Sequence, residues 1–387
     1  MPRPLSLPDE VIARHTSVPP VFGVLVTFHG QPPTLEDLRR RVAARWSSLP
    51  RLRRVLVPTG GRHRWHVPGS FATEQHVHVG ASVSRVLSQE LPTGLPPWQL
   101  HVVPGDNEFT LLLRLHHSLA DSRSLMILTR RLADDSTWAP RPHNRPARSD
   151  LRRLLDGTFG RGTAFDAPTE TRPERAWELI DTRTVQAARH ALPGPPATTS
   201  DVVLAAVTGA LRSRFGDPGG RVFAHVSMDR STVQNANELG NLTTSLRVPL
   251  PVHETTPFDR LAATRGLMGG FSDRALNAPW HLLRAVSLLG TGALDKGLAY
   301  GATPPQIVAT CTSLSWGPEP LVFNGNPATQ AFVLPPVPHE RTSFFLHTRY
   351  RDTSAIALAT QLGPGDAQLL ADGFADEVAH LGQLVRR

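Results

Sequence analysis

The stretch Leu113-Arg114-Leu115-His116-His117-Ser118-Leu119-Ala120-Asp121 carries two adjacent histidines at the end of an apolar run, and an acid four residues after the second. The run at residues 109–115 predicts a buried strand. Directly after the acid, Ser122 is predicted to cap a helix with leucines at 125, 128 and 132 along one face. The histidines therefore lie where a strand passes into a helix.

Strands and helices continue to alternate on both sides of this stretch. Upstream, residues 21–28 predict a strand, and Thr34 with Asp37 three residues later starts a helix that ends before Pro50. Downstream, residues 201–215 form the strongest predicted helix, small and apolar along one side. Further strands are expected at 222–227, 245–249, 306–312, 330–334, 344–350 and 354–360, and helices at 258–268, 282–300 and 366–385. Because no regular strand–helix–strand repeat appears, we predict a mixed α/β (α+β) fold.

The chain changes character between residue 138 and about residue 174. Pro, Arg, Asp, Gly and Thr dominate there, and the hydrophobic periodicity is lost. We therefore predict two α/β lobes, an N-terminal lobe over 1–137 and a C-terminal lobe over 177–387, joined by a crossover linker over 138–176.

Composition excludes several classes of protein. With 387 residues, 40% of them hydrophobic and 19% charged, the chain can bury a sizeable core and is not disordered over its whole length. Cys311 is the only cysteine, so no intrachain disulfide can form. The N-terminal residues lack the apolar stretch of a secretory signal, and residues 282–300 are too interrupted by charges to span a membrane. We expect a cytoplasmic protein.

The charge balance is basic. Lysine and arginine number 41 against 33 acids, a formal net charge of +8, and Lys296 is the only lysine. Such a chain could bind nucleic acid, an anionic membrane surface, or an anionic cofactor or carrier protein. The arginines are spread out in short groups without interleaved aromatics, which is typical of solvated helix faces and not of a nucleic-acid interface. We expect no nucleic-acid partner.

The two histidines are the best candidates for chemistry. Side chains that follow each other on a strand point to opposite faces, so only one imidazole can face a given cavity. An imidazole with a pKa near ~6.5 can take and return a proton at neutral pH. Asp121 could fix the loop through an arginine or through backbone amides. Alternatively, one histidine is a core residue bonded to a carbonyl and the other is exposed. No metal site is predicted, because adjacent histidines diverge and no Cys or Glu cluster completes a ligand set.

The segment His116-His117-Ser118-Leu119-Ala120-Asp121 resembles the HHxxxDG motif of the condensation-domain and CoA-dependent acyltransferase superfamily. Within it, the chain is most similar to the bacterial wax ester synthase/diacylglycerol acyltransferase family. Other segments resemble family motifs in the same order along nearly the whole chain: Pro96-Pro97-Trp98-Gln99-Leu100-His101-Val102-Val103, the helix from Thr199-Ser200-Asp201 to Arg212, Asn237-Glu238-Leu239-Gly240-Asn241, and Gly317-Pro318 with Gly325.

The chain departs from the family pattern at three places. Ser122 stands where the family has the motif glycine, and Ser200 stands where it has an asparagine before Asp201. The family's SNVPGP segment appears as Ser313-Leu314-Ser315-Trp316-Gly317-Pro318. These departures favour a divergent acyltransferase over a standard storage-lipid enzyme.

The resemblance implies two chloramphenicol-acetyltransferase-like lobes that form a V-shaped pseudo-dimer with a central tunnel. It places His117 as the general base and His116 behind it, orienting the loop. Asp121 is expected to be structural, paired with Arg230. Three residues are expected to bind substrate (Ser118, Ser122 and Asn241), and Asp201 and Trp98 to support the fold.

The activity that follows from the resemblance is transfer of an acyl group from a thioester donor, acyl-CoA or an acyl carrier protein, to an alcohol or amine acceptor, in lipid or natural-product biosynthesis. Ester formation is favoured, and no cofactor is expected beyond the CoA or phosphopantetheine of the donor. Two alternatives stay open: a free-standing condensation enzyme for carrier-bound substrates, and a catalytically silent binding protein. Residues 282–289 could also make a peripheral membrane contact as an amphipathic helix.

Overall fold

The computed structural model describes residues 3–14, 19–67, 71–134, 160–166, 170–232, 234–268 and 273–383. The chain divides into two compact units. Unit 1 comprises residues 1–142, 231–242 and 316–336, and unit 2 comprises residues 143–230, 243–315 and 337–387. Unit 1 is thus built from three separate segments, two of which come from the second half of the chain.

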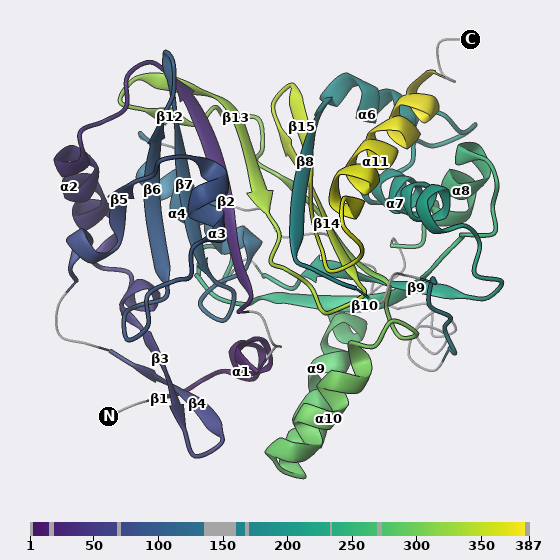
Figure 1. Ribbon diagram of the computed structural model, residues 1–387, viewed down its shortest axis with the longest axis horizontal. Helices are drawn as coiled ribbons and strands as arrows, with labels where there is room; N and C mark the ends of the chain where they lie inside the picture. The colour runs from purple at the N-terminus through teal and green to yellow at the C-terminus, as the bar shows by residue number, and fades with distance from the viewer. Residues whose placement is uncertain are drawn as a thin grey trace. The chain divides into compact units, whose positions relative to one another are not determined.

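Unit 1 is centred on a six-stranded sheet (Figure 1). The order of its strands is β12-β13-β2-β7-β6-β5. Their bounds are β12 Val322–Phe323, β13 Asn326–Leu334, β2 Val21–His29, β7 Glu108–His116, β6 Trp98–Pro104 and β5 Val77–Val79. All neighbours pair antiparallel except β5 with β6. Strands β2 and β7 are buried along most of their length, so both of their faces are covered.

Helices α2 (Leu35–Trp46) and α4 (Ser122–Leu132) pack together in unit 1, where Nε1 of Trp46 donates to the carbonyl of Leu128 at 3.3 Å. The predicted cap of α2 is confirmed, since Oγ1 of Thr34 accepts from the backbone N–H of Asp37. The shorter helices of this unit are α1 Leu7–Ala13, η1 Pro50–Arg53, η2 Thr73–Gln75 and α3 Val83–Ser88. A small second sheet, in the order β1-β4-β3, consists of β1 Arg3–Pro4, β4 Arg62–His66 and β3 Val55–Thr59.

Unit 2 contains another six-stranded sheet, in the order β10-β9-β11-β14-β15-β8. Its strands are β10 Thr243–Leu250, β9 Val222–Asp229, β11 Ala309–Ser315, β14 Ser343–Tyr350, β15 Thr353–Thr360 and β8 Glu174–Asp181. Strand β11 runs parallel to both β9 and β14, and the other pairs are antiparallel.

Helices α7 (Thr199–Phe215) and α11 (Asp366–Gln383) form the main helical layer of unit 2. Small residues at their contact let the backbones approach, and a methyl group at Gly373 would lie 3.4 Å from the Cα of Ala210. The remaining helices are α6 Thr182–Arg189, α8 Pro257–Thr264, α9 Asp273–Leu288 and α10 Thr291–Gly301. The predicted α/β class is confirmed in both units.

The structure corrects several predicted boundaries. The cap of α4 is Asp121, and Ser122 is the first helical residue. The single helix expected over 282–300 is two helices separated at Gly290, whose φ of 107° suits glycine. Strand β8 begins at Glu174, inside the predicted linker; most of the rest of that linker, residues 138–159 and 167–169, lies outside the described residues.

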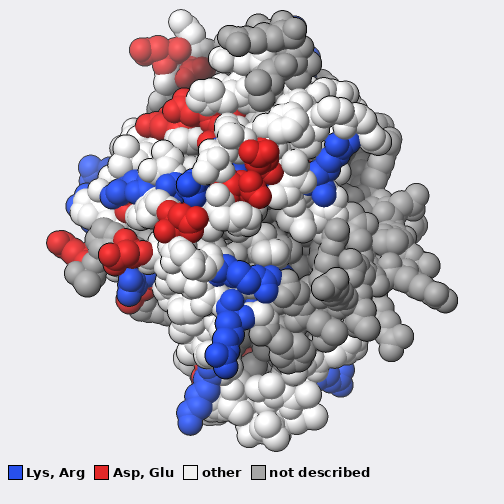
Figure 2. All heavy atoms as spheres, turned by 90° about the vertical axis from the view of Figure 1, so that its right-hand side faces the viewer, with Lys and Arg blue, Asp and Glu red and all other residues white. Residues whose placement is uncertain are grey.

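Two surface features bear on the earlier expectations. Among the helices that the structure describes, none is long and apolar enough to cross a membrane. On the face shown in Figure 2, basic and acidic side chains are mixed over the upper part of the coloured surface, and a short run of basic side chains lies below them. This mixture agrees with arginines on solvated faces.

Candidate active site

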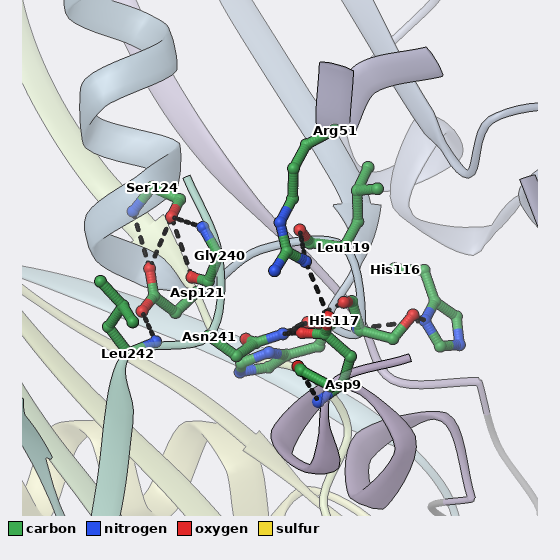
Figure 3. A network of polar contacts seen from close by, with 12 residues as sticks. Asp9, Arg51, His116, His117, Leu119, Asp121, Ser124, Gly240, Asn241 and Leu242 are labelled. Carbon is green, nitrogen blue, oxygen red and sulfur yellow. Dashed lines mark hydrogen bonds and ion pairs between the residues drawn. The ribbon is translucent and has the colours of Figure 1, made fainter. Parts of the chain in front are cut away.

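The loop between β7 and α4, residues 117–121, is fixed through its main chain. The N–H of His117 donates to the carbonyl of Pro20 at 2.8 Å, and the N–H of Asp121 donates to the carbonyl of Gly240 at 3.1 Å. Between them, the N–H of Leu119 donates to the carbonyl of His116 at 2.9 Å. The loop is therefore held at both ends, which fixes its course. Figure 3 shows side chains of this loop with the residues around them.

The imidazole of His117 is partly buried and stacks on the ring of Phe22, with centroids 4.4 Å apart and planes at 19°. Its Nδ1 is buried and has no hydrogen-bond partner among the described residues. Burial lowers the pKa of His117, although the carbonyls of His117 and Ala120, the Asp121 carboxylate and the Asn241 amide act in the opposite direction. His117 is therefore neutral at pH 7 and able to accept a proton.

His116 is engaged by its own loop. Its Nδ1 accepts from the backbone N–H of Ser118 at 3.2 Å and lies 2.8 Å from the hydroxyl of Ser118. Burial, together with the imidazoles of His117 and His63, lowers the pKa of His116 to about 4. Since one ring nitrogen is occupied by this turn, His116 stabilises the loop and is a poorer candidate for proton transfer.

Asp121 is the N-cap of α4 and is almost fully buried. One carboxylate oxygen accepts from the N–H and the hydroxyl of Ser124, at 2.9 and 2.8 Å, and the other accepts from the N–H of Leu242 at 2.8 Å. These bonds replace the predicted ion pair with Arg230. Arg230 instead donates to Oδ1 of Asn277 at 2.6 Å. Backbone amides, the other option raised from the sequence, hold the motif aspartate.

Asn241 connects the loop to a distant segment of unit 1. Its Nδ2 lies 3.0 and 3.1 Å from the carbonyls of His117 and Ser118, and 2.9 Å from Oδ1 of Asp9. The side chain is buried and its two amide hydrogens are shared among these three acceptors. Asn241 therefore positions the backbone around His117, and the substrate contact predicted for it stays a prediction.

Asp9 and Arg51 complete the network, and sequence reasoning missed both. Asp9, 1% exposed in α1, accepts from Asn241 through one oxygen and from Nη1 of Arg51 through the other, at 3.1 Å. The same Nη1 donates to the carbonyl of Leu119 at 3.0 Å. A methyl group at Gly240 would lie 2.8 Å from Nη2 of Arg51, so glycine leaves room for the guanidinium.

Part of this network had a signal in the sequence. Ser6 followed by Pro8 and Asp9 is a helix start, and Ser6 does cap α1 by accepting from the N–H of Asp9 at 3.3 Å. The helix could therefore have been predicted, but no local pattern indicates that its first-turn acid is buried against residue 241.

The other residues predicted from the sequence have the following positions in the fold. Ser118 is fully buried and bonded to His116, so it supports the loop, and the substrate contact predicted for it stays a prediction. Ser122 is partly exposed at the start of α4. Trp98 is buried, and its Nε1 donates to the carbonyl of Leu52 at 2.8 Å. Asp201 completes a capping box with Thr198 at the start of α7. In the described part of the chain, no three His, Cys, Asp or Glu side chains are grouped so that they could hold a metal ion.

Comparison with known proteins identifies the family to which this chain belongs. The model of the wax ester synthase/diacylglycerol acyltransferase catalytic domain matches residues 24–265, which include the whole histidine loop and Asn241. The chain belongs to the wax ester synthase/diacylglycerol acyltransferase family. It is therefore an acyltransferase, and the resemblance found in its motifs is confirmed.

Relatives of this wax ester synthase/diacylglycerol acyltransferase family member are remote in sequence. The probable diacylglycerol O-acyltransferase tgs2 of Mycobacterium tuberculosis is 27% identical, over 76% of this chain and 78% of the relative. The wax ester synthase/diacylglycerol acyltransferase from Marinobacter aquaeolei VT8 matches 100% of both chains with a TM-score of 0.67 at 17% identity. The first condensation domain of the CDA synthetase matches 99% of this chain and 96% of the domain, with a TM-score of 0.65 at 17% identity. The structural matches show that the fold is shared with condensation domains.

Proposed function

We propose that this acyltransferase moves an acyl group from a thioester donor to an alcohol, with His117 as the general base. The observation that carries the proposal is the imidazole of His117, partly buried at the start of a loop whose backbone is bonded at both ends. A base has to be unprotonated at working pH and held in one orientation, and the surroundings of His117 supply both conditions.

The reaction transfers one proton and exchanges one bond. His117 removes the hydroxyl proton of the acceptor, and the alkoxide attacks the thioester carbonyl. The C–O bond forms, the C–S bond breaks, and the imidazolium returns the proton to the leaving thiolate, which gives an ester and a free thiol. An amine acceptor follows the same course and gives an amide.

The carbonyls near His117 favour this role. The carbonyls of His117 and Ala120 act to raise the pKa of the imidazole, which stabilises the imidazolium that forms when the base takes a proton. Asn241 and Asp121 act in the same direction and also keep the loop in place.

Relatives suggest which substrates to try first. The names of the mycobacterial relatives include diacylglycerol O-acyltransferase, which supports an alcohol acceptor and makes diacylglycerol the first one to test. A condensation domain of similar fold, that of rhizomide synthetase, was solved with C8-CoA and Leu-SNAC, so acyl-CoA and carrier-type thioesters both belong among the donors. Beyond the thioester of the donor, the proposed reaction needs no cofactor.

The decisive experiment measures thiol release from acyl-CoAs of short to long chain. Each donor is combined with linear alcohols, diacylglycerol or amines, and wild type and His117→Ala are assayed side by side. Acceptor-dependent release in the wild type that is lost in the variant supports the proposal. Equal release from both proteins contradicts the role of His117, and silence of the wild type with every donor and acceptor, carrier-bound donors included, favours a binding protein.

The pH dependence of kcat/KM should carry the signature of this base. Because the pKa of His117 is lowered, the neutral form persists below the ordinary value of ~6.5, and it is lost only as pH falls through the lowered pKa. We expect an acid limb with its midpoint below ~6.5 and a rate that is close to its plateau by about pH 7.5. A midpoint at or above that value would contradict the assignment. His116, with a pKa of about 4, should add nothing in this range.

A further inference from the structure

A group of arginines lies beside the catalytic loop in unit 1. Arg51 in η1 reaches the loop directly, since its Nη1 donates to the carbonyl of Leu119 at 3.0 Å (Figure 3). Arg54 follows η1 at once in the chain, and Arg3 lies in β1. We call Arg3, Arg51 and Arg54 the arginine cluster.

Strand register places Arg3 and Arg54 on one face of the small sheet. Trp65 in the central strand β4 pairs with Arg3 on one side and with Leu56 on the other. Paired residues of antiparallel strands share a face, and so do residues two apart in an extended strand. Arg54 precedes Leu56 by two and has extended backbone angles, φ −88° and ψ 129°. Both guanidinium groups therefore extend from the same face.

The arginine cluster carries more positive charge than the neighbouring Asp9 neutralises. Asp9 forms an ion pair with Arg51, but its two oxygens are already bonded to Asn241 and Arg51. The half-buried Arg54 and the exposed Arg3 have no hydrogen-bond or ion-pair partner for their guanidinium groups among the residues that the structure describes. Burial and the positive charges of Arg51 and Arg3 lower the pKa of Arg54, although Asp9 opposes this effect. An anion between these groups would relieve the repulsion.

We propose that the arginine cluster binds a phosphate group of the thioester donor, with Arg54 as its principal ligand. Guanidinium groups bind phosphate through paired charge-assisted hydrogen bonds, and the guanidinium of Arg54 has no protein partner in the described part of the chain. Arg51 joins the cluster to the loop of His117, so a phosphate held there lies on the same unit as the proposed base. This inference rests on the proposed function only for the identity of the ligand, a thioester donor.

Calorimetric titration tests the proposal without turnover. The ligands are CoA, phosphopantetheine and pantetheine, which carry three phosphates, one and none. The proteins are wild type, Arg54→Gln, Arg54→Lys and the matched control Arg85→Gln, which changes an exposed arginine of α3 whose guanidinium also lacks a partner among the described residues. A thermal melt of each protein shows that it is folded.

We expect Arg54→Gln to raise the Kd for CoA about tenfold and to leave that for pantetheine unchanged. Arg54→Lys should lie between it and the wild type, and Arg85→Gln should match the wild type. If phosphopantetheine binding weakens as well, the contact is to the phosphate that carrier proteins share with CoA; if only CoA binding weakens, it is to the nucleotide phosphates. Unchanged CoA affinity in Arg54→Gln, equal weakening for pantetheine, or no CoA binding by the wild type would overturn the proposal.

The proposed phosphate site and the proposed function can fail independently of each other. Loss of CoA affinity in Arg54→Gln in a protein without measurable transfer would leave the phosphate site standing and remove the role of His117. Transfer that depends on His117, in a protein whose CoA affinity does not depend on Arg54, would do the reverse.

Discussion

Replacing His117 with alanine is expected to lower kcat for acyl transfer by about 10²–10⁴-fold, the usual contribution of a general base. The thermal stability should change much less. The N–H of residue 117 donates to the carbonyl of Pro20, its carbonyl accepts from the side-chain amide of Asn241, and neither bond involves the imidazole. Initial rates of thiol release at saturating donor and acceptor, with a melting curve of the same preparation, measure both quantities.

His116→Ala is the matched control for this prediction. Its imidazole accepts from the N–H of Ser118 and has a pKa of about 4, so its loss should lower kcat less than about tenfold. Added imidazole should restore part of the rate in His117→Gly, since the face of Phe22 on which the ring stacks is still present. Equal losses in the two alanine variants, without rescue, would point to a structural role for both histidines.

Asn241→Asp should be the most destabilising isosteric change in unit 1. It replaces an amide donor by a carboxylate that faces Asp9 and the carbonyls of His117 and Ser118. An uncompensated buried charge costs about 3–5 kcal/mol of unfolding free energy, and a displaced loop should lower kcat as well. Urea unfolding at pH 7 measures the effect. The difference from wild type should shrink as pH falls toward about 4, because protonation of the introduced carboxyl restores a donor.

Asn235→Asp provides the comparison for this variant. Its Oδ1 accepts from the N–H of Thr232 at 2.7 Å, an acceptor role that a carboxylate fills equally well. We expect a change within about 0.5 kcal/mol. If the two substitutions proved equally mild, the amide of Asn241 would not be the connection between the loop and α1.

The local parts of the site could be predicted from the sequence because their signals are local. The apolar run before His116 predicted strand β7, the cap at Thr34 predicted α2, and the ordered motifs indicated the family. The partner of Asp121 could not be found in this way. A carboxylate at a helix start satisfies backbone amides, and the one at Leu242 is supplied by a segment 121 residues away.

The long-range partners had no sequence signal at all. Asp9 and Asn241 are separated by 232 residues, and nothing in the pattern around either indicates the other. In the sequence, an arginine that pairs with a buried acid, such as Arg51, cannot be distinguished from an arginine on a solvated face. Pairing of this kind is decided by the packing of whole elements, which periodicity does not describe.

The placement of β13 also has a consequence for how the protein is made on the ribosome. Strand β2 (residues 21–29) has β13 (residues 326–334), which comes far later in the chain, as one of its two neighbours in the sheet. One edge of β2 therefore stays unpaired on the ribosome until β13 has been synthesised, and unpaired sheet edges tend to pair with other strands. Unit 1 cannot be completed by the N-terminal half alone, and a chain split near its middle should yield fragments that aggregate unless they are produced together.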